Sequence, residues 1–571
     1  MRLLLLTHAF NSLAQRLFVE LRADGHEVSV EFDIADAVTE EAVALWQPDV
    51  VIAPFLKRRI PTSVWSTRTC LVVHPGPPGD RGPSALDWAI ERGEREWGVT
   101  VLQANGDYDA GPVWAWRGFA MRPDATKSSL YRHEVVDAAL AAVREALSKW
   151  RAGAPQAGTT LAAGCWRPLM RQAERALDWS RDDTTTALRR LRAAEGHPGV
   201  ADALFGVPAQ LFDAHRASDD DLRRAPPGEP GAIVARRGPA LLRRTVDGGV
   251  WIGHLRRHRA EGEPTLKLAA TRAFAAESDA LPELPVPLMR DDATWDELRY
   301  REQGPAGARV GVLSFEFHNG AIGTRQCLRL TAALQEVALR PTQVLVLDGG
   351  PDYFCNGIHL HEIEAEQLEG GSAADASMRN IEAIDDVALA ILSLTDRMVV
   401  AALRGNAGAG GCFLALAADE VWIHGGVVQN PHYKNMGNLH GSEYWTYLLP
   451  RRVGEQQARA LMQARLPMGA RDALKLGLAD AVLSDDTAGF VEAVLRRAGA
   501  VAPGAGERVR AKARGREADE RARPLAEYRA DELRQMDRNF YGFDASYHVA
   551  RHHFVHRKPQ AWTPRHLALH R

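Results

Sequence analysis

The sequence of 571 residues predicts an α/β protein with a doubly wound parallel sheet, a small OB-like β-barrel and a second α/β domain, in that order. Residues 1–155 alternate short β-rich runs with helical patterns, which is typical of a parallel sheet covered by helices. Residues 156–275 contain short β runs separated by glycine turns, as in small barrels. Residues 276–308 are rich in proline and acidic side chains, which indicates a linker, and residues 309–571 form the last domain.

Composition indicates a globular protein of a reducing compartment. The chain is 46% apolar and 25% charged, and its net charge of −3 gives no electrostatic footprint for nucleic acid. Five cysteines are scattered without a C-x-x-C pair, so we expect neither a disulfide framework nor a structural zinc ion. The apolar run Leu3–Leu6 is too short for a signal-peptide core, and no run is long enough to span a membrane. We therefore expect a cytoplasmic protein that binds no nucleic acid and no membrane.

The first elements follow directly from the pattern of apolar residues. The leucine run 3–6 predicts a strand, and a helix capped at residues 11 and 12 should continue to Ala23, where Gly25 stops it. Residues 28–32 and 49–53 predict the next two strands. Strands that alternate with helices in this way favour parallel pairing.

The loop between the first strand and the first helix is a candidate anion site, because backbone N–H groups at a helix N-terminus attract negative charge. Asn11, Ser12, Gln15 and Arg16 either contact a phosphate there or merely cap the helix. The first interpretation makes Gln15 a cofactor contact.

A candidate catalytic group follows the β-branched run 71–73. The run ends in His74 and then breaks into a Pro/Gly loop that contains Arg81 and Gly82. Such a loop presents a side chain at the carboxyl edge of an α/β sheet. If the next predicted strand, 99–103, is the neighbour, Asp109 reaches the same edge. A carboxylate beside an imidazole fixes its tautomer and favours its protonated form, so the two predict an acid/base pair. The alternative is a structural histidine.

These residues resemble the catalytic segment of the 10-formyltetrahydrofolate-dependent formyltransferases, whose pattern is Asn-x-His, a proline-containing loop with Arg-Gly, and Leu-Asp-Thr-Gly. His74, Arg81-Gly82 and Asp109-Ala110-Gly111 match, whereas Val72 stands where the family has Asn. The resemblance implies 10-formyltetrahydrofolate as formyl donor, catalytic roles for His74 and Asp109, and cofactor contacts at Arg81 and Gly82. Loss of the Asn amide, which helps to hold an oxyanion, argues against ordinary formyl transfer. Residues 160–275 resemble the C-terminal barrel domain of the same enzymes.

A second candidate site lies in the C-terminal domain. The stretches LVLDGGPDYFCNGIHLHEI and VVAALRGNAGAGGCFLALAADEVWI each run from a strand through a glycine-bearing turn into a helix. Two such turns can aim two backbone N–H groups at one oxygen and form an oxyanion hole. With the later segments 449–454 and 470–483, they resemble the crotonase (enoyl-CoA hydratase/isomerase) superfamily, whose domain has a spiral α/β fold. The resemblance implies that the N–H groups of Ile358 and Gly410 form the hole.

The two catalytic glutamates of hydratases fall on Phe413 and Tyr433, so we do not expect hydration of an enoyl thioester. The resemblance still implies a site that binds a thioester carbonyl. The phenol of Tyr433 and the carboxyl group of Glu443, ten residues further on, are its candidate catalytic groups. The alternatives are a core aromatic at Tyr433 and a surface residue at Glu443. The resemblance also implies coenzyme A contacts at Asn319 and Arg325.

Four histidines near the C-terminus, His548, His552, His553 and His556, include two i,i+4 pairs that could bind a metal ion on a helix. Because no fixed carboxylate partner is evident, we expect a surface His/Arg face and no metal.

A formyl-donor site and a thioester clamp on one chain suggest formyl-CoA as a shared intermediate. The combination resembles the hydrogenase maturation factors of the HypX/HoxX family. The resemblance implies formyl transfer from 10-formyltetrahydrofolate to coenzyme A, followed by decarbonylation to carbon monoxide for the iron of [NiFe]-hydrogenase. The implied partners are these small molecules and hydrogenase maturation proteins. Two alternatives are a formyltransferase with another acceptor, fused to an acyl-CoA-processing domain, and a non-catalytic assembly factor that binds folate and coenzyme A.

Overall fold

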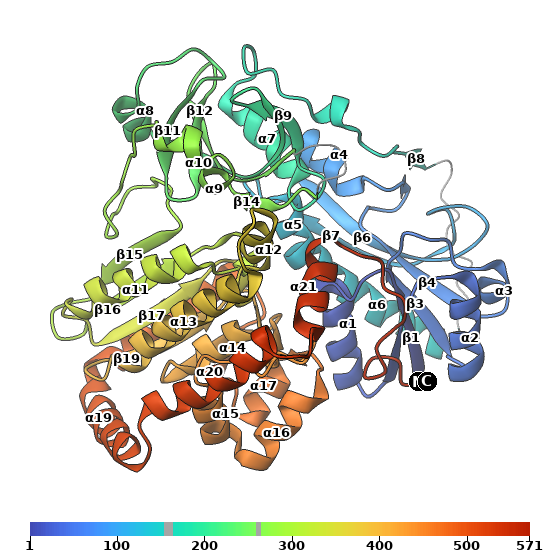
Figure 1. The fold of residues 1–571 in the computed structure, drawn as a ribbon. Coiled ribbons are helices and arrows are strands. Elements are labelled where there is room, and N and C mark those ends of the chain that lie inside the picture. The colour runs from blue at the N-terminus through green and yellow to red at the C-terminus, as the bar shows by residue number, and fades with distance from the viewer. Residues whose placement is uncertain (154–163, 259–263) are drawn as a thin grey trace. The chain divides into compact units, whose positions relative to one another are not determined.

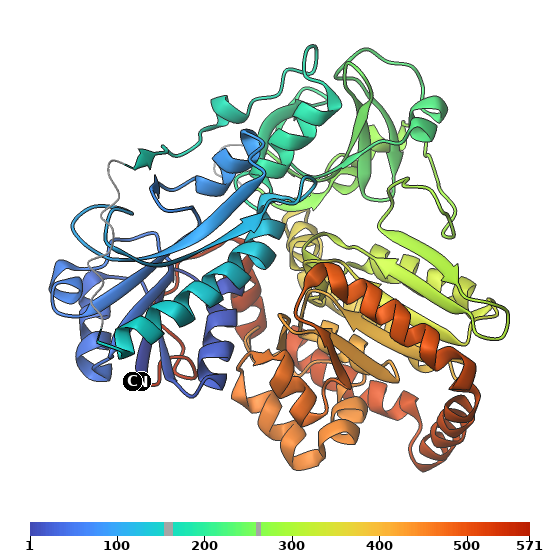
Figure 2. The same cartoon turned by 180° about the vertical axis from the view of Figure 1, so that it is seen from behind.

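The computed structural model describes residues 1–153, 164–258 and 264–571. The chain forms two compact units, drawn from opposite sides in Figures 1 and 2. Unit 1 comprises Met1–Ala260, Ala269–Pro282 and Pro559–Arg571, and unit 2 comprises Glu261–Leu268 and Glu283–Lys558. No helix in the described part of the chain is both long and apolar enough to cross a membrane.

Unit 1 begins with a six-stranded sheet in the order β2-β1-β3-β4-β6-β7. Its first four strands are parallel, which confirms the doubly wound arrangement, but β6 and β7 run antiparallel to their neighbours. Residues 104–112 join β6 to β7, and this connection is shorter than the dozen or more residues that a parallel crossover needs. The strands are β1 (Arg2–Thr7), β2 (Glu27–Phe32), β3 (Val50–Phe55), β4 (Thr69–His74), β6 (Glu96–Gln103) and β7 (Val113–Ala120).

Helix α1 (Ser12–Ala23) illustrates how the sequence sets these elements. The Asn11 side chain accepts a hydrogen bond from the Ala14 N–H at 3.0 Å and caps the helix. Beyond its end Gly25 adopts a φ of +84°, as predicted for a stop signal. Helix α6 (Val136–Arg151) packs on β6 and β7 and against α1 (Figure 2). The other helices of this sheet are α2 (Asp36–Trp46), α3 (Thr62–Trp65), α4 (Ala85–Glu91) and α5 (Lys127–Leu130).

The middle of unit 1 is an antiparallel sheet in the order β11-β12-β13-β10-β9 that packs against α7 (Thr184–Ala194). Among the described residues its outer strands β9 and β11 do not pair, so the predicted barrel is an open sheet. The strands are β9 (Val200–Leu204), β10 (Val207–Arg216), β11 (Ile233–Arg237), β12 (Ala240–Arg244) and β13 (Gly249–Arg257).

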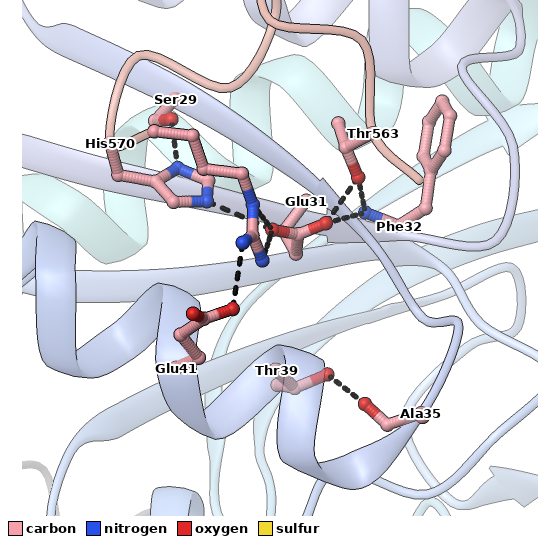
Figure 3. Close-up of polar contacts among 9 residues, drawn as sticks. Ser29, Glu31, Phe32, Ala35, Thr39, Glu41, Thr563 and His570 are labelled. Carbon is pink, nitrogen blue, oxygen red and sulfur yellow. Dashed lines mark hydrogen bonds and ion pairs between the residues drawn. The ribbon is translucent and has the colours of Figure 1, made fainter. Parts of the chain in front are cut away.

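The C-terminal segment of the chain covers the edge strand β2 (Figure 3). The Val30 N–H donates to the Leu567 carbonyl at 3.0 Å, so backbone groups of the edge strand find partners in residues that we had assigned to the last domain. Glu31, on the same strand β2, is fully buried under the C-terminal segment. Its carboxylate accepts hydrogen bonds from His570 and Arg571, each at 2.8 Å, and from Thr563. Burial alone would raise its pKa, but these three hydrogen bonds hold the pKa of Glu31 below its ordinary value.

Unit 2 contains two sheets, in the orders β15-β16-β17-β19-β21-β24 and β18-β20-β22-β23. The central strands β17 and β19 are buried along their whole length, as expected for parallel strands covered on both faces. Strand β15, from the predicted linker, pairs antiparallel with β16. The strands are β15 (Leu298–Gln303), β16 (Val310–Phe315), β17 (Val344–Gly349), β18 (Tyr353–Cys355), β19 (Met398–Leu403), β20 (Asn406–Gly408), β21 (Glu420–His424), β22 (Val428–Asn430), β23 (Met468–Gly469) and β24 (Ala481–Ser484).

The helices of unit 2 cover these sheets; most of them share one large apolar core with them, and α18 packs in a second apolar cluster with β16, β17, β19 and β21. They are α11 (Thr324–Ala338), α12 (Leu360–Leu368), α13 (Ala373–Leu392), α14 (Gly410–Leu416), α15 (Trp445–Val453), α16 (Glu455–Ala464), α17 (Ala470–Leu476), α18 (Thr487–Val501), α19 (Ala505–Ala522), α20 (Leu525–Tyr541) and α21 (Ser546–Val555). The long charged stretch near the C-terminus forms the helices α19 and α20.

Candidate active sites

The site in unit 1 is built around His74, the last residue of β4, whose side chain is almost fully buried. Its Nε2 atom lies 2.9 Å from Oδ2 of Asp80, and the other oxygen of that carboxylate is held by the Arg167 guanidinium. Asp80 is not among the residues that the sequence pattern predicted, although it stands directly before the Arg-Gly pair. The imidazole is therefore oriented by an ion-paired carboxylate that lies only six residues away along the chain.

Asp109 faces the other ring nitrogen, with its Oδ2 atom 3.7 Å from Nδ1 of His74. The predicted neighbour strand is indeed next to β4, but it is antiparallel and its last residue pairs with Leu71. The turn after the strand, rather than the strand end, brings Asp109 to the histidine. Gly82 N–H donates to Asp109 at 3.0 Å, and Arg81 donates twice to the carbonyl of Tyr108, so the Arg-Gly pair holds this turn.

The loop after β4 depends on a glycine. A Cβ atom on Gly76 would lie 2.4 Å from Oδ2 of Asp80 and 2.5 Å from Nε2 of His74, so only glycine allows this approach. Thr100 donates to the carbonyl of Gly76 at 2.8 Å, and the Trp97 indole donates to that of Pro75 at 2.9 Å. The result is a fixed imidazole between two carboxylates, an arrangement suited to moving a proton.

The loop before α1 shows how its polar side chains are used. Asn11 caps the helix, as the second interpretation predicted, and Gln15 donates to the carbonyl of Phe10 at 2.8 Å. Arg16 is buried and pairs with Glu20 at 3.2 Å. Contact of Gln15 with a ligand stays a prediction.

In unit 2, the two predicted turns meet. Helix α14 begins at Gly410, preceded by Ala409 at a φ of +48°. A Cβ atom on Gly357 would lie 3.4 Å from the Gly410 nitrogen, so the N–H groups assigned to Ile358 and Gly410 belong to adjoining backbone segments. A Cβ atom on Gly410 would lie 2.1 Å from Oε1 of Glu443, so the carboxyl group of Glu443 lies directly beside the backbone of Gly410.

Tyr433 and Glu443 form a buried pair beside these turns. The Tyr433 hydroxyl lies 2.5 Å from Oε2 of Glu443 and 3.0 Å from the carbonyl of Ser442. Glu443 is 1% exposed, so the alternative of a surface residue is wrong. The Phe413 ring stacks on Tyr433 at 5.2 Å between centroids, which places an apolar face where hydratases carry a glutamate.

The electrostatics of this buried cluster favour neutral groups. Burial, reinforced by the negative charge of Asp385, raises the pKa of Glu443 to about 8. Burial and the neighbouring Glu443 raise the pKa of Tyr433 well above its ordinary value. Asp385 accepts a hydrogen bond from the Glu443 N–H at 2.7 Å, and burial raises its own pKa to about 6. Asp385 is not among the predicted site residues, although a carboxylate inside the apolar stripe of α13 is a recognisable signal.

The remaining predicted residues lie elsewhere in unit 2. Asn319 and Arg325 are exposed, near the start of α11, and the Asn319 carbonyl accepts a hydrogen bond from Asn356 at 2.8 Å. Their contact with coenzyme A stays a prediction. The expectation that the C-terminal histidines lack a carboxylate partner is wrong, because Glu364 on α12 faces both His552 and His556.

Comparisons with known proteins match each half of the chain to a known family. Residues 24–146 match the formyl transferase family model, and residues 312–565 match the enoyl-CoA hydratase/isomerase family model. Methionyl-tRNA formyltransferase from Myxococcus xanthus is 30% identical over 34% of this chain and 61% of its own length.

Two further similarities cover the whole chain. Hydrogenase maturation factor HoxX from Bradyrhizobium diazoefficiens is 53% identical over 580 residues, which span 100% of this chain and 97% of that protein. The crystal structure of HypX from Aquifex aeolicus in complex with tetrahydrofolic acid superposes with a TM-score of 0.94 at 43% identity, covering 100% of this chain and 99% of that one. The chain therefore belongs to the HypX/HoxX family of hydrogenase maturation factors, with a formyltransferase domain followed by an enoyl-CoA hydratase-like domain.

Proposed function

We propose that this protein transfers a formyl group from 10-formyltetrahydrofolate to coenzyme A and then decarbonylates formyl-CoA. The carbon monoxide serves the iron centre of [NiFe]-hydrogenase in the cytoplasm, where hydrogenase maturation proteins receive it. The observation that carries the proposal is the buried Tyr433–Glu443 pair beside Gly410, with Phe413 in place of a water-activating carboxylate. This buried pair can move a proton, and no carboxylate stands at position 413 to activate water.

In the first step the thiol sulfur of coenzyme A attacks the formyl carbon. The bond from that carbon to N10 of the folate breaks, and the thiol proton ends on N10. His74 takes and returns this proton between Asp80 and Asp109, while Arg81 and Gly82 hold the turn that carries Asp109. A thiolate is a strong nucleophile, so this step tolerates Val72 where an amine acceptor would need the missing amide.

In the second step the carbon–sulfur and carbon–hydrogen bonds of formyl-CoA break and carbon monoxide leaves. The sulfur keeps its electron pair and receives a proton, the formyl hydrogen leaves as a proton, and no water is consumed. The N–H groups of Ile358 and Gly410 polarise the carbonyl oxygen. Tyr433 and Glu443 relay the proton from carbon to sulfur, a task that suits a carboxyl group with a pKa of about 8. Gln15, Asn319 and Arg325 are proposed ligand contacts outside the chemistry.

The test supplies the full chain with 10-formyltetrahydrofolate and coenzyme A and traps carbon monoxide on deoxyhaemoglobin. His74→Ala should release none from these substrates but should still release it from added formyl-CoA. Tyr433→Phe should instead accumulate formyl-CoA and release none from either source. Tyr541→Phe, which alters an exposed tyrosine, is the matched control and should behave as the native chain.

The same assay separates the alternatives. Labelled formyl groups that appear on an acceptor other than coenzyme A would replace the first step with a different transfer. Tight binding of folate and coenzyme A without turnover by the native chain would favour a non-catalytic assembly factor. Full carbon monoxide release by Tyr433→Phe would remove Tyr433 from the mechanism.

A further inference from the structure

A cluster of potential metal ligands lies in unit 2, outside both candidate active sites. His552 on α21 and His556 at its C-terminal end follow each other at i,i+4, so both side chains project from one face of the helix. Glu364 on α12 faces them: its Oε1 atom lies 2.7 Å from Nε2 of His556 and 3.2 Å from Nδ1 of His552. The three ligand atoms all lie within 4.8 Å of one another.

The carboxylate of this cluster is held in place from behind. The buried Arg551 donates through Nε to Oε2 of Glu364 at 2.9 Å, which leaves Oε1 directed at the two imidazoles. Arg551 is itself held by Gln367 at 2.6 Å and by His548 at 2.8 Å. Metal-binding carboxylates are commonly oriented by a hydrogen bond to their second oxygen, and Arg551 supplies it here.

We propose that Glu364, His552 and His556 bind one divalent transition-metal ion of the zinc class. Bonds of about 2.0–2.2 Å in a tetrahedral centre hold their donor atoms roughly 3.3 Å apart. The Glu364 oxygen lies at 2.7 and 3.2 Å from the two ring nitrogens, close to that value. Two imidazoles and one carboxylate are a donor set that zinc favours. The His552 side chain is 48% exposed, so water can occupy the fourth position, whereas Glu364 is 4% exposed and brings a buried negative charge.

Such an ion would connect two helices that are far apart in the sequence. Helix α12 directly follows the turn that carries Ile358, and α21 is the last helix of unit 2. Because the ion binds the folded arrangement of ligands more tightly than the unfolded chain, it should raise the thermal stability of unit 2.

The experiment titrates Co²⁺, and then competing Zn²⁺, into full-length protein that has been freed of metal by chelator at pH 7.5. We expect one ion per chain, visible absorption bands typical of tetrahedral Co²⁺, and a rise in Tm on addition of Zn²⁺. His552→Ala should weaken binding by at least about 100-fold and abolish the rise in Tm. His553→Ala changes the adjacent, exposed histidine and should leave both unchanged.

X-ray absorption of the zinc-loaded native chain gives an independent measurement, with two imidazoles expected in the coordination shell. The proposal is overturned if the native chain binds no stoichiometric ion, if His552→Ala binds as tightly as the native chain, or if the bound zinc shows no imidazole ligands. In the first case the three side chains would form a hydrogen-bonded cluster only.

Discussion

Replacing Glu443 by glutamine should abolish carbon monoxide release and, at the same time, make the stability of the protein less dependent on pH. The ordinary pKa of this carboxyl group is 4.5, and in the folded protein it is raised to about 8. Because the carboxyl pKa is raised on folding, the unfolded chain loses this proton at a lower pH than the folded chain does. The contribution of Glu443 to the unfolding free energy is therefore fully present below pH 4.5 and is lost as pH rises through 8. Each pKa unit corresponds to about 1.36 kcal/mol, so the interval represents about 5 kcal/mol of unfolding free energy.

Glutamine keeps the shape of the side chain but does not titrate. Its carbonyl oxygen can still accept the hydrogen bond from Tyr433, while its amide group faces Gly410 in place of Oε1. The variant should therefore escape the loss of stability that native protein suffers between pH 5 and 8, and the gain should increase with pH. At the same time, release of carbon monoxide from formyl-CoA should be abolished.

Calorimetry across this pH range measures the difference directly, because about 1 kcal/mol shifts the Tm of a domain of this size by roughly 2–4 °C. Glu455→Gln changes an exposed glutamate on α16 and should follow the native profile. A Tm difference between Glu443→Gln and native protein that does not change from pH 5 to pH 8.5 would refute the reasoning.

Three further substitutions probe the remaining features. Gly410→Ala places a methyl group 2.1 Å from Oε1 of Glu443, so the carboxyl group must move; we expect about a 10²-fold slower release of carbon monoxide from formyl-CoA, with formyl transfer unchanged. Phe413→Glu introduces a carboxylate that can activate water, so the ratio of formate to carbon monoxide, measured by product analysis, should rise by about 10²-fold or more. Arg571→Ala removes a charged partner of the buried Glu31 and should lower the unfolding free energy by about 1.5–3 kcal/mol. Because the pKa of Glu31 is held below 4.5, urea denaturation should show this loss at neutral pH and a smaller one as pH falls below that value.

The parts of the fold that sequence analysis predicted are those with a strong local pattern. The apolar runs that became β17 and β19 are buried on both faces, and such runs carry their own signal. Helix α1 is marked by Asn11 at its start and Gly25 after its end, and both act as predicted. His74 and Asp109 also lie together, but through an antiparallel strand and a folded turn that the pattern did not reveal.

What sequence analysis missed depends on partners that are distant along the chain. Asp80 owes its position to Arg167, 87 residues later, and Asp385 acts on Glu443 across 58 residues. Thr563 bonds to the Phe32 N–H across 531 residues, so no local pattern could assign the C-terminal segment to unit 1. The open sheet in place of a barrel has the same cause, since closure depends on pairing between strands at opposite ends of the sheet.

The proposed function places different requirements on its two proton-transfer sites: His74 must accept and return a proton, whereas Glu443 must supply a proton without activating water. In unit 1 the imidazole of His74 is flanked by carboxylates, of which Asp80 is ion-paired with Arg167, an arrangement suited to the proton transfer proposed for the first step. In unit 2 an ionised carboxylate beside the polarised carbonyl would activate water and convert the thioester to formate. Burial keeps Glu443 mainly protonated at neutral pH, and the Phe413 ring, stacked on Tyr433, offers no group that could activate water. A raised carboxyl pKa thus serves both needs at once, because the same proton that is available to sulfur is the one whose presence prevents Glu443 from acting as a base toward water.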